Sequence, residues 1–155
     1  MPVNRATIAT GLSALALAVA TPFIAQWEGK RNDPYRDIVG VMTVCYGETN
    51  VPMRRYTDQE CIDMLERSVA QYRDRVLQCT PSLQGHPYQL AAATSLAYNI
   101  GPNAYCRSTV DRRFDQGDFK GACEAFKMWN KAGGRVVQGL VNRRNSEYNL
   151  CMTYL

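Results

Sequence analysis

Histidine and closely spaced metal ligands are scarce in this sequence. It has a single histidine, His86, and none of its six cysteines forms a C-x-x-C pair. Structural zinc sites need Cys or His ligands set close together, so we expect no metal and no cofactor. His86 lies between Gly85 and Pro87, where an exposed loop residue is expected.

The sequence also lacks a strong excess of positive or negative charge. The net charge is only +4, from 18 basic and 14 acidic residues scattered along the chain, and this is too small a surplus to indicate a nucleic-acid partner. It is compatible with a polyanionic target such as a cell wall. With 155 residues, 46% of them apolar and 21% charged, the chain is neither disordered nor a multi-span membrane protein.

The six cysteines indicate disulfide bonds formed outside the cytoplasm. The alternative is a cytosolic protein with six buried free thiols. Fifteen pairings are possible, and we expect each cysteine to pair with its neighbour along the chain. Only the pair nearest the C-terminus has further support, because its two cysteines fall on adjacent expected helices. The expected pairs are Cys45–Cys61, Cys79–Cys106 and Cys123–Cys151.

The N-terminal segment has no ionisable residue from Ala6 to Trp27, and Arg5 precedes it. Residues 6–25 would form a helix of about 30 Å, the thickness of the hydrocarbon core of a bilayer. Twelve of these twenty residues are Ala, Gly, Ser or Thr, and Pro22 interrupts them. The segment is therefore only weakly suited to a membrane.

Three interpretations of this segment stay open. Ala18-Val19-Ala20 before Thr21 resembles the cleavage site of a signal peptide. An uncleaved signal anchor fits the length, with Arg5 keeping the N-terminus in the cytoplasm. A buried core helix is the third. The first two place the cysteines in the envelope of a bacterium.

The remaining pattern predicts an α+β fold dominated by helix. Thr21 and Pro22 are typical of the start of a short helix over residues 23–28, and the residues from Tyr35 to Tyr46 favour a small hairpin. The capping box at residues 57–60 predicts a long helix. The helices expected from there on cover residues 58–79, 88–100, 108–116, 118–131 and 139–152.

Two carboxylates and a hydroxyl suggest a chemistry. Glu28 follows Trp27 at the expected end of the short helix, and Asp37 and Thr43 lie in the hairpin. A glycosidase needs one protonated carboxyl group as the acid and one ionised carboxylate for the water or the sugar. On spacing alone, two solvated surface carboxylates would be the better explanation of the pair, because the chain has 14 acidic residues.

A longer string of residues resembles one family. Trp27-Glu28-Gly29, Tyr35-Arg36-Asp37, Gly40, Thr43 and Tyr46-Gly47 resemble the catalytic segment of the phage-type lysozymes, glycoside hydrolase family 24. In that family a Glu at a helix end is followed by an Asp nine residues on and a Thr six beyond. Residues 95–101, 119–129 and 139–144 resemble later segments of the family.

The resemblance implies a lysozyme-like fold, in which a long helix joins a small hairpin lobe to a helical lobe. It implies a monomeric muramidase that cuts the β-1,4 bond between N-acetylmuramic acid and N-acetylglucosamine in peptidoglycan. Glu28 would be the general acid, and Asp37 with Thr43 would hold the attacking water in the inverting mode. One position departs from the family, because Glu48 stands where many relatives have histidine.

The N-terminus is similar to that of the signal-anchor-release endolysins. This implies residues 1–25 as an anchor in the bacterial inner membrane and residues 26–155 as the catalytic domain, released later into the periplasm. Glu28 is only three residues past Ala25, so an anchored segment would keep it at the lipid headgroups. Since no cysteine precedes Cys45, refolding of the segment rather than thiol exchange would regulate activity. Cleavage of a signal peptide is the alternative.

Other functions and side-chain roles stay open at this point. A catalytically inactive wall-binding protein, or another glycan hydrolase such as a chitinase, is compatible with the same pattern. Cys45 is expected in a disulfide rather than as a nucleophile. Arg143 and Arg144 would either reach Glu28 or the glycan or lie on a helix surface, and Trp129 is expected in the core.

Overall fold

The computed structural model describes the backbone of residues 5–155 and the side chains of residues 10–155. The predicted anchor segment covers residues 1–25. Its residues 1–4, and the side chains of residues 5–9, therefore lie outside the described part of the chain. The chain forms helices and two short hairpins, in the order α1 (Arg5–Ala25), β1 (Arg31–Arg36), β2 (Met42–Cys45), α2 (Asp58–Cys79), α3 (Pro87–Ile100), α4 (Pro102–Cys106), α5 (Thr109–Asp115), α6 (Phe119–Ala125), β3 (Lys131–Ala132), β4 (Arg135–Val136) and α7 (Gln138–Cys151).

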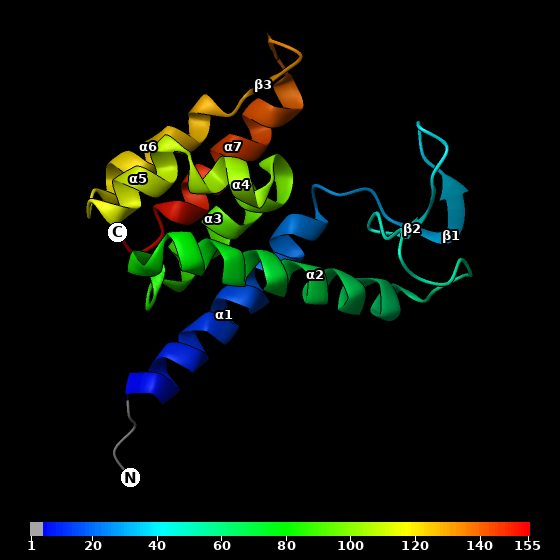
Figure 1. Ribbon diagram of the computed structural model, residues 1–155, viewed down its shortest axis with the longest axis horizontal. Helices are drawn as coiled ribbons and strands as arrows, with labels where there is room; N and C mark the ends of the chain where they lie inside the picture. Colours follow the sequence, from blue (N-terminus) through cyan, green and yellow to red (C-terminus); the bar gives the residue numbers. More distant parts are fainter. Residues whose placement is uncertain (1–4) are drawn as a thin grey trace.

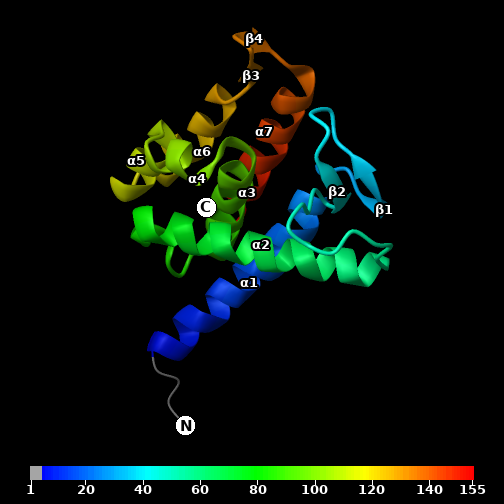
Figure 2. The same ribbon diagram turned by 45° about the vertical axis from the view of Figure 1, so that its right-hand side comes forward.

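The fold has two lobes joined by α2, as predicted. The β1–β2 hairpin lies at one end of α2, and helices α3 to α7 gather at the other end (Figure 1). Helix α1 crosses α2 and leads through a short loop to the hairpin, as a second view shows (Figure 2). The mixed, mostly helical class is confirmed.

Helix α2 begins at the predicted capping box. The N–H of Glu60 donates to Thr57 Oγ1 and the N–H of Thr57 donates to Glu60 Oε1, both at 3.1 Å. Along its length, α2 contributes buried side chains to three hydrophobic clusters. Cys61 packs with the hairpin lobe, Leu65 packs against α1, and Val76 packs in the helical lobe. The helix therefore belongs to both lobes and to the layer between them.

Helix α1 differs from the prediction. The expected start at Thr21 is wrong, because one continuous helix runs from Arg5 to Ala25 with Pro22 inside it. Pro22 is exposed, so its ring lies on the outer face, while the Thr21 hydroxyl donates to the carbonyl of Leu17 at 2.9 Å instead of capping a new helix. The prediction that Glu28 is the last helical residue is also wrong, since it lies in the loop beyond Ala25.

One face of α1 is buried against α2 and α3. Ala16, Ala20 and Ile24 are at most 1% exposed, and Thr21 is buried beside them. Small side chains allow the backbones of packed helices to approach closely, so the same residues that weaken a membrane segment suit a protein interface. Among the described residues, no helix has the length and hydropathy that crossing a membrane requires.

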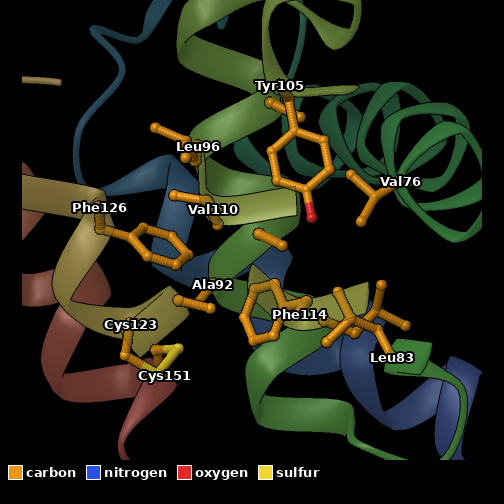
Figure 3. Close-up of a cluster of buried hydrophobic side chains, with 14 of the residues drawn as sticks. Val76, Leu83, Ala92, Leu96, Tyr105, Val110, Phe114, Cys123, Phe126 and Cys151 are labelled. Carbon is orange, nitrogen blue, oxygen red and sulfur yellow. A yellow bond between two sulfur atoms is a disulfide. The ribbon is translucent and has the colours of Figure 1, made fainter. Parts of the chain in front are cut away.

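The main core lies in the helical lobe. Tyr105, Phe114 and Phe126 are fully buried and meet between α3, α4, α5 and α6 (Figure 3). Trp129 packs half-buried against this cluster, which agrees with its expected place in the core.

Three disulfides connect the elements with the expected pairing. Cys45–Cys61 joins β2 to the start of α2, Cys79–Cys106 joins the end of α2 to α4, and Cys123–Cys151 joins α6 to α7. No free cysteine is found among the described residues, so the proposal of six free thiols is not supported.

Two boundaries were predicted incorrectly. The helix expected over residues 118–131 ends as α6 at Ala125, and after a short 3₁₀ turn the chain forms the β3–β4 hairpin. Gly133 and Gly134, with φ of 58° and 75°, make its two-residue turn, a conformation that glycine adopts without strain. The first hairpin begins at Arg31, before the predicted start at Tyr35.

If α1 is an integral part of the fold, then truncating its buried face destabilises the whole chain. We expect Ile24→Ala to lower the free energy of unfolding by about 2 to 4 kcal/mol, because the side chain is fully buried. Leu15→Ala on the same helix, where the side chain is 40% exposed, should change it by less than about 0.5 kcal/mol. Denaturant unfolding of both variants checks this, and equal effects would contradict it.

Candidate active site

Glu28 is held by a buried arginine from the far end of the chain. Arg143 on α7 donates from Nη1 to Glu28 Oε1 at 3.0 Å. The Arg143 side chain is 5% exposed, whereas the Glu28 side chain is 27% exposed. The carboxyl group is therefore fixed at one oxygen and still accessible from solvent, as an acid acting on a polymer must be.

Arg143 is itself fixed by two further residues. Its Nη2 donates to the backbone carbonyl of Ser95 on α3 at 3.2 Å and contacts the Ser95 hydroxyl oxygen at 3.4 Å. Its Nε lies 3.5 Å from Oε2 of Glu147, one turn further along α7. The guanidinium thus ties the loop that carries Glu28 to α3 and α7.

Glu147 is the centre of this buried charge cluster. It is 0% exposed, accepts a hydrogen bond of 2.5 Å from the Ser95 hydroxyl, and lies 2.6 Å from Nε of Arg144. Arg144 also donates to Oδ1 of Asn99 at 2.9 Å. Burial raises the pKa of Glu147, against the opposing effect of both guanidinium groups, and burial lowers the pKa of Arg144.

The two arginines thus resolve an open alternative. Neither lies on the helix surface, and Arg143 is the one that reaches Glu28. The roles of Ser95 and Glu147 were missed by the sequence analysis. The signal available was the spacing of Glu147, which lies four residues after Arg143 and three after Arg144 and therefore on the same helix face as each of them.

Asp37 is held by the turn of the first hairpin. Its Oδ1 accepts hydrogen bonds from the backbone N–H groups of Val39 and Val41, both at 2.9 Å. Gly40, with φ of 86°, permits the bend between them. These two bonds fix the orientation of the carboxylate, and no described group is bonded to its Oδ2.

Thr43 lies on β2, opposite Tyr35 of β1. Its side chain is nearly buried, and its hydroxyl donates to the carbonyl of Val41 at 2.9 Å. Because the proton of the hydroxyl is used in this bond, its oxygen is left to accept.

A hollow of about 490 Å³ lies beside Asp37. Gly29, which follows Glu28, and Asp37 both line it. Its other lining residues come from the loop, from β1 and from the hairpin turn, and are Lys30, Arg31, Tyr35, Arg36 and Ile38.

Tyr98 on α3 lies close enough to Glu28 and Glu48 for both charges to act on it. Burial, and then the negative charges of these two residues, raise the pKa of Tyr98 to about 12, so its phenol is neutral at physiological pH. Glu48 accepts a long hydrogen bond of 3.4 Å from the Ser68 hydroxyl. The position that departs from the family pattern therefore uses a neutral partner on α2.

The remaining candidates lie elsewhere. Cys45 is half of a disulfide, so it is not a nucleophile. His86 is exposed in front of α3, with its ring against Phe119. Over the part of the chain that the structure describes, no three His, Cys, Asp or Glu side chains are grouped so that they could hold a metal ion.

Comparison with known proteins gives consistent matches. The family model described as Phage lysozyme matches residues 25–147. A SAR-endolysin of Bacteriophage PS119 is 34% identical over 168 residues, covering 97% of this chain and 95% of that protein. A SAR-endolysin of Pseudomonas phage phiKMV is 36% identical over 147 residues, covering 91% of each.

Solved structures agree with these matches. A crystallised mutant of P22 lysozyme has a TM-score of 0.78 at 26% identity, with 87% of this chain and 96% of that chain covered. The muramidase domain of SpmX from Asticaccaulis excentricus has a TM-score of 0.74 at 25% identity, with 86% and 95% covered.

The buried cluster behind Glu28 makes Ser95 a sensitive position. Ser95→Ala removes the hydroxyl that donates to Glu147, and we expect the free energy of unfolding to fall by about 1 to 3 kcal/mol because a buried acceptor loses its partner. Ser146→Ala, at a half-buried position on α7, should cost less than about 0.5 kcal/mol. Thermal unfolding measures both, and an unchanged Ser95 variant would show that the cluster does not depend on this hydroxyl.

Proposed function

Because this chain belongs to the phage lysozyme family, it is a glycoside hydrolase that acts on peptidoglycan, and we propose that Glu28, Asp37 and Thr43 carry out its reaction. The bond cut is the β-1,4 link between N-acetylmuramic acid and N-acetylglucosamine, and its loss lyses the host cell. The observation that carries the proposal is that a buried arginine fixes Glu28, whose next residue in the chain, Gly29, lines the same hollow as Asp37.

Glu28 acts as the general acid. Its proton passes to the oxygen of the glycosidic bond as the bond to C1 of the muramic acid breaks, which leaves a sugar hydroxyl on the departing N-acetylglucosamine. The carboxylate that remains is stabilised by Arg143, 3.0 Å away, because a charge-assisted hydrogen bond is strongest to the ionised form.

Asp37 acts as the base for the incoming water. Its Oδ1 is occupied by Val39 and Val41, so Oδ2 is the oxygen that accepts a proton from the water as the water oxygen bonds to C1. The Thr43 hydroxyl oxygen accepts the second hydrogen of that water, since its own proton is bonded to Val41. This arrangement serves an inverting hydrolysis.

Loss of the acid tests these roles. Glu28→Gln keeps the shape of the side chain but has no proton to donate, so we expect clearance of a peptidoglycan suspension to slow by about 100-fold or more. Glu66→Gln, an exposed position on α2, should clear at the rate of the wild type. Unchanged melting temperatures show that both variants fold.

The products of the same digests separate the alternatives. We expect fragments with muramic acid at the reducing end. Full activity of the Glu28 variant would refute the acid assignment, release of chitin oligomers from chitin would indicate a chitinase, and binding without cleavage by the wild type would indicate a wall-binding protein.

A membrane-tethered state precedes the active one in our proposal. Residues 1–25 anchor the chain in the inner membrane with the N-terminus in the cytoplasm, and the released, monomeric enzyme acts in the periplasm. The SAR-endolysin relatives match this chain over almost its full length, which supports the proposal. So does the packing of α1, because the buried Ala16, Ala20 and Ile24 cannot contact lipid and α2 at the same time.

Docking of α1 is also what positions the acid. Arg73 of α2 donates from Nη1 to the carbonyl of Ser13 at 3.2 Å, and the α1 backbone ends three residues before Glu28. A helix held in the bilayer would keep Glu28 away from Arg143 and from the hollow beside Asp37. Release and activation are then one event.

More apolar side chains on the outer face of α1 should hold the chain in the membrane. Ala14 and Ala18 are exposed, so Ala14→Leu with Ala18→Leu leaves the docked face unchanged while favouring insertion by about 1 kcal/mol. We expect a larger membrane fraction and slower lysis than for the matched serine variants.

N-terminal sequencing of the soluble periplasmic form tests release directly. The proposal predicts an N-terminus at Met1 or at the residue after it. A soluble form beginning at Thr21 would instead indicate a cleaved signal peptide.

A further inference from the structure

The hollow beside Asp37 is rich in positive charge. Lys30, Arg31 and Arg36 line it, against the single carboxylate of Asp37. The ammonium group of Lys30 is already paired with Asp58. Arg31 and Arg36 have no carboxylate within ion-pair distance among the described residues, so two exposed guanidinium groups face the hollow without a counter-ion from the protein.

Both guanidinium groups are held near the hollow by neutral contacts. Arg31 lies over the ring of Tyr35, 4.6 Å from its centre, and Arg36 donates from Nη1 to the carbonyl of Gly40 at 3.2 Å. Such contacts orient an arginine without neutralising it, and a planar guanidinium presents a pair of donors that suits a carboxylate. Ile38, which is fully exposed at the edge of the hollow, adds an apolar surface.

The substrate brings negative charge to this place. The inference rests on the proposed function, in which water attacks C1 of the muramic acid beside Asp37. The lactyl group on C3 of that same sugar ring carries the stem peptide, and the stem bears several free carboxylates. The stem therefore begins two ring atoms from the reacting carbon, where the ionised Asp37 would repel it unless cations lay nearby.

We propose that Arg31 and Arg36 bind the carboxylates of the peptide stem on the muramic acid that is being cut. The hollow then recognises the stem as well as the sugar, and the enzyme prefers glycan strands that carry charged stems to neutral glycans such as chitin. Because the two side chains contact the stem and not the reacting atoms, they act on binding of the substrate rather than on the chemical step.

A cycle of protein and substrate variants tests this. The substrate is a preparation of soluble, uncross-linked peptidoglycan strands with acetylated amino groups, either untreated or with the carboxylates converted to neutral methylamides. At low ionic strength the variant Arg31→Gln/Arg36→Gln should raise KM for untreated strands about 3- to 10-fold with kcat unchanged, since exposed ion pairs contribute modestly and are screened by salt.

The neutral substrate and a control variant complete the cycle. On methylamidated strands the wild type and the variant should have the same KM, within about two-fold. The control Arg107→Gln/Arg112→Gln makes the same change of net charge at two exposed positions of the helical lobe and should not alter KM on either substrate.

Two outcomes overturn the inference. An unchanged KM on untreated strands would show that the guanidinium groups do not contact the stem, and an equal rise on both substrates would show that they bind the sugar or support the fold. In both cases the hydrolysis itself continues, so the proposed function stands. A wild type that cuts neither substrate would overturn the proposed function and this inference with it.

Discussion

The contact between Glu28 and Arg143 is the constraint on which the site depends. It joins a loop near the start of the chain to a helix near its end, across 115 positions of sequence. Arg143 is nearly buried, and burying a guanidinium is costly unless its charge is paired and its N–H groups are bonded. Glu28 and the Ser95 carbonyl accept hydrogen bonds from its Nη1 and Nη2, and Glu147 adds a second opposite charge 3.5 Å from its Nε, which has no hydrogen-bond partner among the described residues. The cluster thus supports the partly exposed carboxyl group of Glu28, and removing one of the buried charged members, Arg143, Arg144 or Glu147, leaves an excess charge inside the helical lobe.

The same constraint gives α1 its importance. The chain leaves α1 at Ala25 and reaches Glu28 three residues later, so the position of the helix sets the position of the acid. Helix α1 is held to α2 and α3 by the small buried side chains of Ala16 and Ala20 together with Ile24. A segment of this composition packs well in a protein and inserts poorly in lipid, so the docked helix α1 agrees with the core-helix interpretation, and the membrane anchor stays a proposal.

Much of the fold was predictable because its signals are local. The capping box of α2, the helical spacing of apolar residues and the resemblance of the segment from Trp27 to Gly47 led to the two-lobed fold and to Glu28, Asp37 and Thr43 as candidates. The start of α1 was predicted wrongly because Thr21 and Pro22 are typical of a helix start, whereas the Thr21 hydroxyl bonds to Leu17 within a continuous helix. The cluster around Glu147 could not be predicted, since it depends on α3 and α7 meeting in space. The role of each catalytic candidate stays a proposal.

The disulfides have a further consequence for the bridge between the lobes. Cys61, in the first turn of α2, is bonded to Cys45 of the hairpin, and Cys79, the last residue of α2, is bonded to Cys106 of α4. Each end of α2 is therefore linked covalently to its own lobe. Closing loops of 16, 27 and 28 residues contributes about 3 to 4 kcal/mol each through the unfolded state. A chain kept under reducing conditions lacks this stabilisation, and it reaches its full stability only where its thiols are oxidised. The stability of this protein therefore depends on the redox conditions around it as well as on its sequence.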